Sequence, residues 1–166
     1  MGHKTYIKGF NRLVEVMEAD EGILTHLCIV AAGTTNNATP QMPERFVKAG
    51  GISINRYLSE DEVMSLKNTS SAIWALYDPY YNSSSGMFGR AMQLGKHTIV
   101  RKGTYIERMA NELNYPAFSI DFQDTDQILT ALRAIAKTPA PANHGTIISE
   151  LKTLSTSRLQ NAMAFK

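Results

Sequence analysis

The sequence predicts an α/β protein with a Rossmann-like, doubly wound parallel sheet that carries helices on both faces. Two observations lead to this fold class: β-rich apolar runs alternate with amphipathic helical patterns along most of the chain, and the connections between them are short. The length of 166 residues and the hydrophobic content of 43% suffice for one buried core. We expect one domain over residues 1–137. Residues 138–166 should form a linker and a C-terminal helix that packs on the same domain.

The first part of the chain reads as helix, strand, short helix, strand and helix. Apolar positions at helical spacing over residues 10–17 predict the first helix, and the run "LTHLCIVAAG" after it predicts a buried strand. A proline-containing polar stretch predicts a loop with a short helix, and "ISINRY" predicts a second strand. Ser59 and Glu62 form a capping-box signature, which predicts a helix over residues 60–67.

The same alternation continues to residue 137. The runs "SAIWALY", "HTIVR" and "PAFSID" predict three more strands, and amphipathic patterns follow each of them. The break "TPAPANHG" then precedes a predicted terminal helix within residues 146–164. In a doubly wound sheet, ligands bind outside the carboxyl ends of the strands. The loop "DPYYNSSSG", residues 78–86, lies at such an end and is the first place to look for a site.

Composition excludes several classes of partner and site. The 17 basic and 15 acidic residues are spread along the chain, so a nucleic-acid partner is not expected. A lone cysteine, Cys28, cannot form an internal disulfide, and the histidines lack the spacing of a metal site, so no metal cofactor is expected. No apolar run approaches the roughly 20 residues that cross a bilayer. We therefore expect a cytoplasmic chain without a membrane segment, although a parent enzyme could associate with the membrane surface.

The loop over residues 78–86 is chemically suited to an anion. A helix that starts near Ser84 and Ser85 would present free backbone N–H groups, and Gly86 has no side chain to block a phosphate that approaches Met87. The simpler interpretation is that the serines only cap the helix and the glycine eases a turn. Local sequence alone favours this simpler interpretation.

Two basic residues near the start are further candidates for the same anion. Lys8 precedes the first helix and could reach a phosphate over the edge of the sheet, although taken alone it reads as a solvated surface charge. His3 could act as a second donor, but the start "MGH" is also typical of an expression remnant.

Several segments together resemble a known enzyme family. "KGFNRLVEVM" and "RYLSEDEVMSLKNTSSAIWALYDPYYNSSSGMFGRAMQLGKHTIVRKGTYIER" resemble, in order and spacing, the carboxyl-terminal half of a GT-B glycosyltransferase. The likeness is to the large retaining family that includes sucrose-phosphate synthases and many bacterial sugar transferases acting on cell-surface polysaccharides. It covers roughly residues 2–135. The matching positions are Lys8 to Phe10, Arg56 to Ser59, Asp78-Pro79, Ser85-Gly86, Ala91-Met92, Gly95, Gly103 and Glu107.

The resemblance implies a site for a nucleotide-sugar donor. It places Lys8 and His3 at the diphosphate, the backbone of Ser84, Ser85, Gly86 and Met87 under the phosphates or sugar, and Tyr57 and Leu58 beside the nucleobase. Such a site would stabilise the departing nucleoside diphosphate without a metal ion. GT-B enzymes have two Rossmann-like halves, so the resemblance also implies a missing amino-terminal, acceptor-binding half. We accordingly expect a fragment of a longer enzyme, or a chain that has lost its start.

Two positions depart from the family pattern and leave alternatives open. The family commonly carries two glutamates with seven residues between them, where this chain has Asn82 and Arg90. Arg90, Arg101 or Lys102 could supply positive charge at the donor. A non-catalytic GT-B-like module for binding or regulation is the alternative to a sugar transferase. A dehydrogenase half is disfavoured because no Gly-x-Gly-x-x-Gly turn follows a strand.

Overall fold

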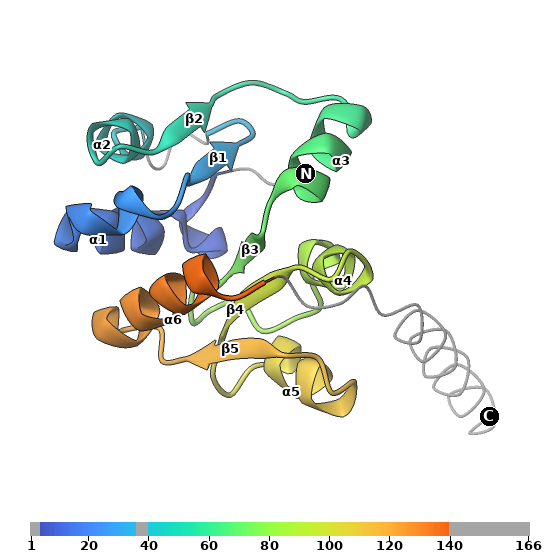
Figure 1. The fold of residues 1–166 in the computed structure, drawn as a ribbon. Helices are drawn as coiled ribbons and strands as arrows, with labels where there is room; N and C mark the ends of the chain where they lie inside the picture. Colours follow the sequence, from blue (N-terminus) through green and yellow to red (C-terminus); the bar gives the residue numbers. More distant parts are fainter. Residues whose placement is uncertain (1–3, 36–39, 140–166) are drawn as a thin grey trace.

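The computed structural model describes residues 4–35 and 40–139 and shows an α/β fold with parallel sheets flanked by helices (Figure 1). The predicted Rossmann-like fold class is thereby confirmed. His3 and the helix expected within residues 146–164 lie outside the described residues. The elements, in chain order, are η1 Tyr6–Lys8, α1 Phe10–Ala19, η2 Glu21–Thr25, β1 Val30–Ala32, α2 Met42–Lys48, β2 Ile52–Ile54, α3 Glu60–Thr69, β3 Ala72–Ala75, α4 Gly86–Gln93, β4 His97–Arg101, α5 Tyr105–Glu112, β5 Ala117–Ile120 and α6 Thr125–Lys137.

All paired strands run parallel, but in the described part of the chain they form two separate sheets. β1 pairs with β2, with Val30 opposite Ile52, and β3, β4 and β5 form the second sheet in that order. Helices follow the strands and return the chain for the next parallel strand. The carboxyl ends of the strands in each sheet therefore lie at one edge of that sheet.

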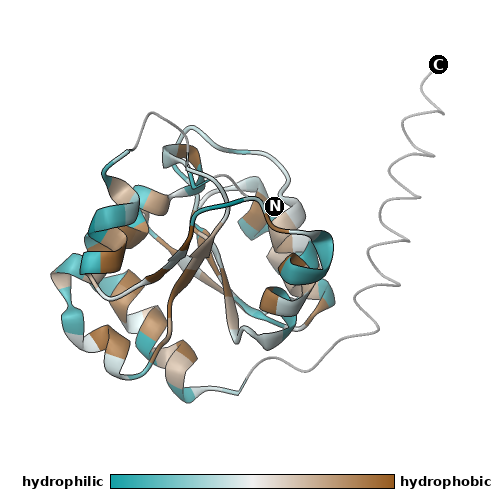
Figure 2. Ribbon diagram, turned by 90° about the horizontal axis from the view of Figure 1, so that it is seen from above, coloured by the Kyte–Doolittle hydropathy of each residue, from teal (hydrophilic) through white to brown (hydrophobic). Residues whose placement is uncertain are grey.

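The three-stranded sheet is buried on both faces. Ile99 and Val100 are neighbours in β4 and are 2% and 0% exposed, although their side chains point to opposite faces. Ile99 belongs to the apolar cluster that includes residues of α6, and Val100 to the cluster that includes residues of α4 and α5. Figure 2 shows the resulting band of hydrophobic strands between the two helix layers. This double coverage explains why the consecutive residues from His97 to Val100 are all buried.

The helix starts follow the capping residues that the sequence indicates. Ser59 Oγ accepts a hydrogen bond from the Glu62 backbone N–H at 3.2 Å, and Glu62 Oε2 accepts one from the Ser59 N–H at 2.8 Å. This capping box opens α3 at Glu60, as predicted. Its inward apolar residues, Val63 and Leu66, are only half-buried.

The run "LTHLCIVAAG" was expected to be one buried strand, and this prediction is wrong in extent and in burial. Its first part lies in η2, and the strand covers only Val30–Ala32. Val30 is 41% exposed, and Cys28 is also exposed. The physical reason is that β1 pairs with β2 along one edge, whereas no strand ladder joins its other edge to β3 in the described part of the chain.

Candidate functional site

The loop between β3 and α4 ends at a capped helix with open space in front of it. Ser85 is the N-cap of α4, and its Oγ accepts a hydrogen bond from the Phe88 N–H at 3.3 Å. A side chain built on Gly86 would meet nothing within 4 Å. Among the described residues no acceptor is bonded to the N–H groups of Gly86 and Met87. Two donors and the positive end of the helix dipole therefore face an accessible space.

Lys8 lies beside this helix start, held between two tyrosines. Its Nζ is 4.5 Å from the ring centroid of Tyr77 and 4.3 Å from that of Tyr81. The Tyr77 hydroxyl shares a 2.7 Å hydrogen bond with Ser85 Oγ, and the Tyr81 hydroxyl donates to the Ser84 carbonyl at 2.7 Å. The same two tyrosines thus contact the lysine and the two residues that precede α4. The fold therefore brings Lys8, Ser84 and Ser85 to the same pair of tyrosines.

The segment that carries Lys8 is docked on the strand that precedes the loop. Gly9 has a φ of 70°, and a Cβ at this position would lie 2.0 Å from the Leu76 carbonyl oxygen. The Asp78 N–H donates to the Ile7 carbonyl at 3.1 Å. Only glycine combines this backbone conformation with this close approach. "KGF" is therefore a structural requirement of the site as well as a source of charge.

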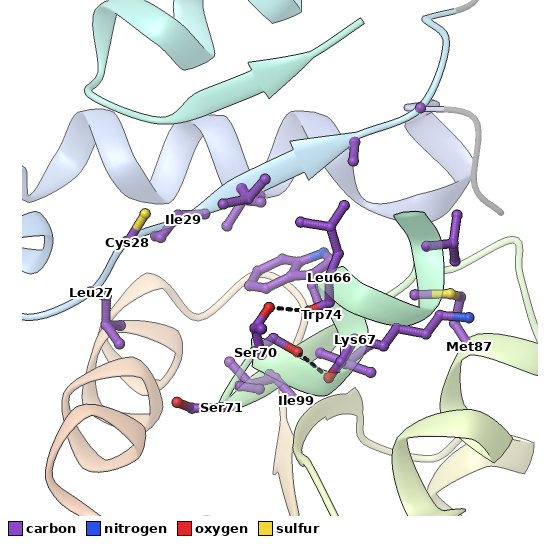
Figure 3. A pocket seen from close by; sticks show the side chains of 18 of the residues that line it. Leu27, Cys28, Ile29, Leu66, Lys67, Ser70, Ser71, Trp74, Met87 and Ile99 are labelled. Atoms are coloured by element: carbon purple, nitrogen blue, oxygen red, sulfur yellow. Dashed lines mark hydrogen bonds between the residues drawn. The ribbon is translucent and has the colours of Figure 1, made fainter. Parts of the chain in front are cut away.

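Tyr57 and Leu58 lie at a neighbouring cavity. Leu58 is 8% exposed and Tyr57 is 70% exposed, and both line a cavity of about 710 Å³ between β1 and β3. Met87 lines the same cavity, where Figure 3 shows it close to Lys67. The predicted residues thus fall into two adjacent groups. The Lys8 group surrounds the start of α4, the Tyr57 group borders the cavity, and Met87 belongs to both.

Arg90 and Asn82 stand where the resembling family carries glutamates, and each has a local partner. Arg90 is exposed and donates from Nη1 to Gln93 Oε1 at 2.8 Å. Burial of Lys67 lowers the pKa of its ammonium group, and the positive charge of Arg90 lowers it further. Asn82 Oδ1 accepts a hydrogen bond from the Tyr105 N–H at 2.8 Å. Asn82 therefore ties the loop to α5, and Arg90 places its charge toward α3.

The structure gives Arg101 a different role from the one considered from sequence. Its Nη2 donates to the carbonyls of Pro79 and Tyr81, at 3.1 and 3.3 Å. Arg101 therefore fixes the β3–α4 loop from the end of β4, and these bonds direct its guanidinium to backbone oxygens. Tyr77 and Tyr81 were missed as site residues. Their spacing of four residues around "DPYYN" is visible in the sequence, but only the fold shows that both rings contact Lys8.

In residues 4–35 and 40–139, no group of three or more histidine, cysteine, aspartate or glutamate side chains is arranged to hold a metal ion. No helix in that part of the chain is long and apolar enough to cross a membrane. The polar groups that converge at the start of α4 are a lysine, two tyrosine hydroxyls and backbone amides.

Comparison with known proteins identifies a structural neighbour. No protein-family model and no curated protein sequence matches the chain. Among solved structures, the chain resembles the crystal structure of WaaG, a glycosyltransferase involved in lipopolysaccharide biosynthesis, with a TM-score of 0.62 at 14% sequence identity. The match covers 83% of this chain and 37% of WaaG. The fold is thus Rossmann-like and matches one half of a GT-B fold, and the chain spans little more than a third of this neighbour.

Proposed function

We propose that this chain is the donor-binding domain of a retaining glycosyltransferase that transfers a sugar from a nucleoside diphosphate to an acceptor in polysaccharide or glycoconjugate synthesis. The observation that carries the proposal is the convergence of Lys8 with the open first turn of α4 at the carboxyl edge of the sheet. Ligands of doubly wound folds bind at this edge. The resemblance to WaaG, itself a glycosyltransferase, supports the same class.

The chemistry follows from the charges that develop during transfer. When the bond between sugar and phosphate breaks, negative charge accumulates on the departing nucleoside diphosphate. The Lys8 ammonium and the N–H groups of Gly86 and Met87 would donate to its phosphate oxygens, and the dipole of α4 favours the same charge. Tyr57 and Leu58 would lie on the nucleobase side. In this scheme no divalent cation is required.

The two tyrosines position Lys8 without neutralising it. A cation over an aromatic ring is stabilised by about 0.5–2 kcal/mol, which restrains the ammonium but leaves its N–H donors available. No carboxylate lies within ion-pair distance of Lys8 in the described part of the chain. A phosphate would therefore meet a lysine that is already oriented and has no competing anion.

Titration of the full chain with UDP-, GDP- and ADP-sugars tests the proposal. We expect one donor class to shift the backbone resonances of Gly86 and Met87 in NMR spectra. Lys8→Ala should weaken that binding about 10- to 100-fold, the range for loss of a charged hydrogen bond of about 1.5–3 kcal/mol. Lys48→Ala, at an exposed position on α2, is the matched control. The proposal fails if a folded chain binds none of the three donors.

The second candidate is a non-catalytic GT-B-like module for binding or regulation. Asn82 and Arg90 favour it, because both are bonded locally and neither supplies a carboxylate. The two candidates differ in one measurement. Sugar transfer by a polypeptide that joins this chain to an amino-terminal Rossmann-like half, abolished by Lys8→Ala, would exclude the non-catalytic module. Donor binding without transfer in that longer polypeptide would support it.

A further inference from the structure

We propose that the cavity between β1 and β3 is the binding site of one extended apolar polypeptide strand, parallel to both, which would join the two sheets into one. The cavity borders the proposed donor site, because Tyr57, Leu58 and Met87 line it. The inference rests on the strand edges of β1 and β3, however, and does not require that a donor binds. It rests on the orientation of the strand edges, on the residues that line the cavity and on a short parallel bridge at Lys4.

Within residues 4–35 and 40–139, backbone groups of β1 on the side of the cavity have no hydrogen-bond partner. The Ile29 carbonyl accepts from the Ile52 N–H at 2.9 Å, and the Gly33 N–H donates to the Ile54 carbonyl at 3.0 Å. In a parallel ladder, alternate residues bond to the same neighbour. Ile29 and Gly33 thus face β2, so the backbone groups of Val30 and Ala32 point away from it.

The facing edge of β3 has the same property. The Ser71 carbonyl accepts from the His97 N–H at 3.1 Å, so alternate residues from Ser71 onward bond to β4. The backbone groups of Ala72 and Trp74 therefore point to the other side. β1 and β3 are each edge strands of their sheets, and both border the same cavity. Two such edges that face one cavity form a template for a strand between them.

The cavity has the length and the lining of a strand site. Its lining runs from Leu27 to Thr34, which includes β1, and from Ser71 to Trp74, which includes most of β3. Its volume is about 710 Å³. The side chains that enclose it from the helices are predominantly apolar: Leu13, Val63, Leu66, Leu132 and Ile135. Figure 3 shows Ile29, which directly precedes β1, and Trp74 of β3. A strand enclosed on both faces in this way is typically apolar throughout.

A bridge at one end of β1 sets the direction of the strand. Lys4 and Thr35 form an isolated parallel bridge, and the Lys4 N–H donates to the Thr34 carbonyl at 2.9 Å. Thr34 belongs to the same alternate series as Val30 and Ala32, so this bond uses the edge of β1 that borders the cavity. Lys4 itself already pairs in parallel with that edge. This bridge also sets the register of the proposed strand, because a position a given number of residues before Lys4 would lie opposite the position the same number of residues before Thr35.

Two side chains have the environment expected beside an absent neighbour. Val30 is 41% exposed although it lies within a strand, and the indole Nε1 of Trp74 is buried without a hydrogen-bond partner among the described residues. A small apolar molecule could cover such side chains, but it would leave the backbone edges of β1 and β3 unpaired. A polypeptide strand satisfies both the apolar lining and the backbone groups.

An engineered extension of the chain tests the proposal. Six alternating valine and isoleucine residues are placed directly before Met1, and six glycine and serine residues serve as the control. Amide hydrogen exchange is measured at Val30, Ala32, Ala72 and Trp74, whose N–H groups face the cavity. We expect exchange there to slow at least tenfold with the apolar extension only. The amides of Ala31 and Ile73, already bonded within their sheets, should change less.

Other outcomes identify other occupants and overturn the proposal. Equal exchange rates with both extensions would do so. A shift in the fluorescence emission of Trp74, the only tryptophan, without slower amide exchange would also overturn the proposal. That result indicates an apolar occupant that is not a strand. Protection that already exists in the unextended chain and accompanies dimerisation would assign the cavity to a second copy. Folding that requires the apolar extension, and fails with the control, would support the strand.

A proline variant separates the strand from a general gain in stability. Val30→Pro removes one N–H that faces the cavity and leaves the bonds between β1 and β2 intact. We expect it to fold in the unextended chain and to reduce the protection produced by the apolar extension at least tenfold at Ala32. Ala31→Pro, which removes a bond to β2, should instead destabilise both chains. Unchanged protection in Val30→Pro would contradict the proposed pairing.

Discussion

The hydroxyl of Tyr77 and the Oγ of Ser85 share a 2.7 Å hydrogen bond between two buried side chains, and this bond joins the end of β3 to the N-cap of α4. The same Tyr77 ring lies under the Lys8 ammonium. One side chain therefore contacts both groups that we assign to the diphosphate. Burial raises the pKa of the Tyr77 hydroxyl, so it remains a neutral hydrogen-bonding group at physiological pH.

Ser85→Ala should destabilise the fold by about 1–2 kcal/mol, because it removes the cap of α4 and leaves the buried Tyr77 hydroxyl without this partner. Urea denaturation followed by circular dichroism measures the change. Ser84→Ala is the matched control, since Ser84 is exposed and contributes its backbone carbonyl, not its side chain, to the bond with Tyr81. Equal midpoints for the two variants would show that the Ser85 side chain does not support the loop.

Gly9→Ala should destabilise the fold by at least about 2 kcal/mol, because alanine is strained at positive φ and its Cβ would clash with the Leu76 carbonyl. Since the same segment holds Lys8, donor binding should weaken as well. Gly86→Ala serves as the control for stability, because open space surrounds that position. A loss of stability in Gly86→Ala as large as that in Gly9→Ala would contradict the close approach that we describe.

The carboxyl group of Glu62 should titrate at an unusually low pH. Its hydrogen bonds with the Arg56 side chain and then the Ser59 N–H lower its pKa from 4.5 to about 2. The unfolded chain binds this proton first as the pH falls, so the stability that the interaction provides is complete above about pH 4.5 and is lost toward pH 2. NMR titration of the carboxyl carbon checks the midpoint.

Arg56→Ala should raise the midpoint of the Glu62 titration, because it removes the principal cause of the shift. The exposed Lys48→Ala variant should leave the midpoint where it is. If the midpoint in Arg56→Ala stays near 2, the ion pair is not what lowers the pKa.

Tyr115 should make the fold sensitive to alkaline pH. Burial raises the pKa of its hydroxyl to about 12, and the hydroxyl donates to the carbonyls of Ala91 and Lys96. Above about pH 10 the unfolded chain releases this proton while the folded chain retains it, so stability decreases as the pH rises toward 12. Tyr115→Phe should reduce this decrease, measured as the urea midpoint from pH 9 to 12. Tyr80→Phe, at a side chain that is 93% exposed, should not.

Local patterns in the sequence predict most of the elements. Capping residues such as Ser59 act within a few positions of the chain, so the start of α3 can be read directly from "SEDE". The adjacent β-branched residues Thr98, Ile99 and Val100 of "HTIVR" are typical of a strand, and helices cover both of its faces. The fold class and the position of the β3–α4 loop follow from such local signals.

Features that depend on distant neighbours could not be predicted in the same way. The exposure of Val30 depends on which strand lies beside β1, and the apolar run that contains it reads the same in either case. The packing of Lys8 between Tyr77 and Tyr81 requires two loops to meet. The role of Arg101 depends on carbonyls of the loop after another strand.

The β3–α4 loop is held at several points before any ligand arrives. Arg101 binds two of its carbonyls, Asn82 attaches it to α5, and the Tyr81 hydroxyl closes it onto Ser84. A loop restrained in this way is preorganised, because its conformational entropy is lost during folding and not during binding. An anion at the start of α4 would then bind with little rearrangement of the backbone, and its affinity would depend mainly on desolvation and charge.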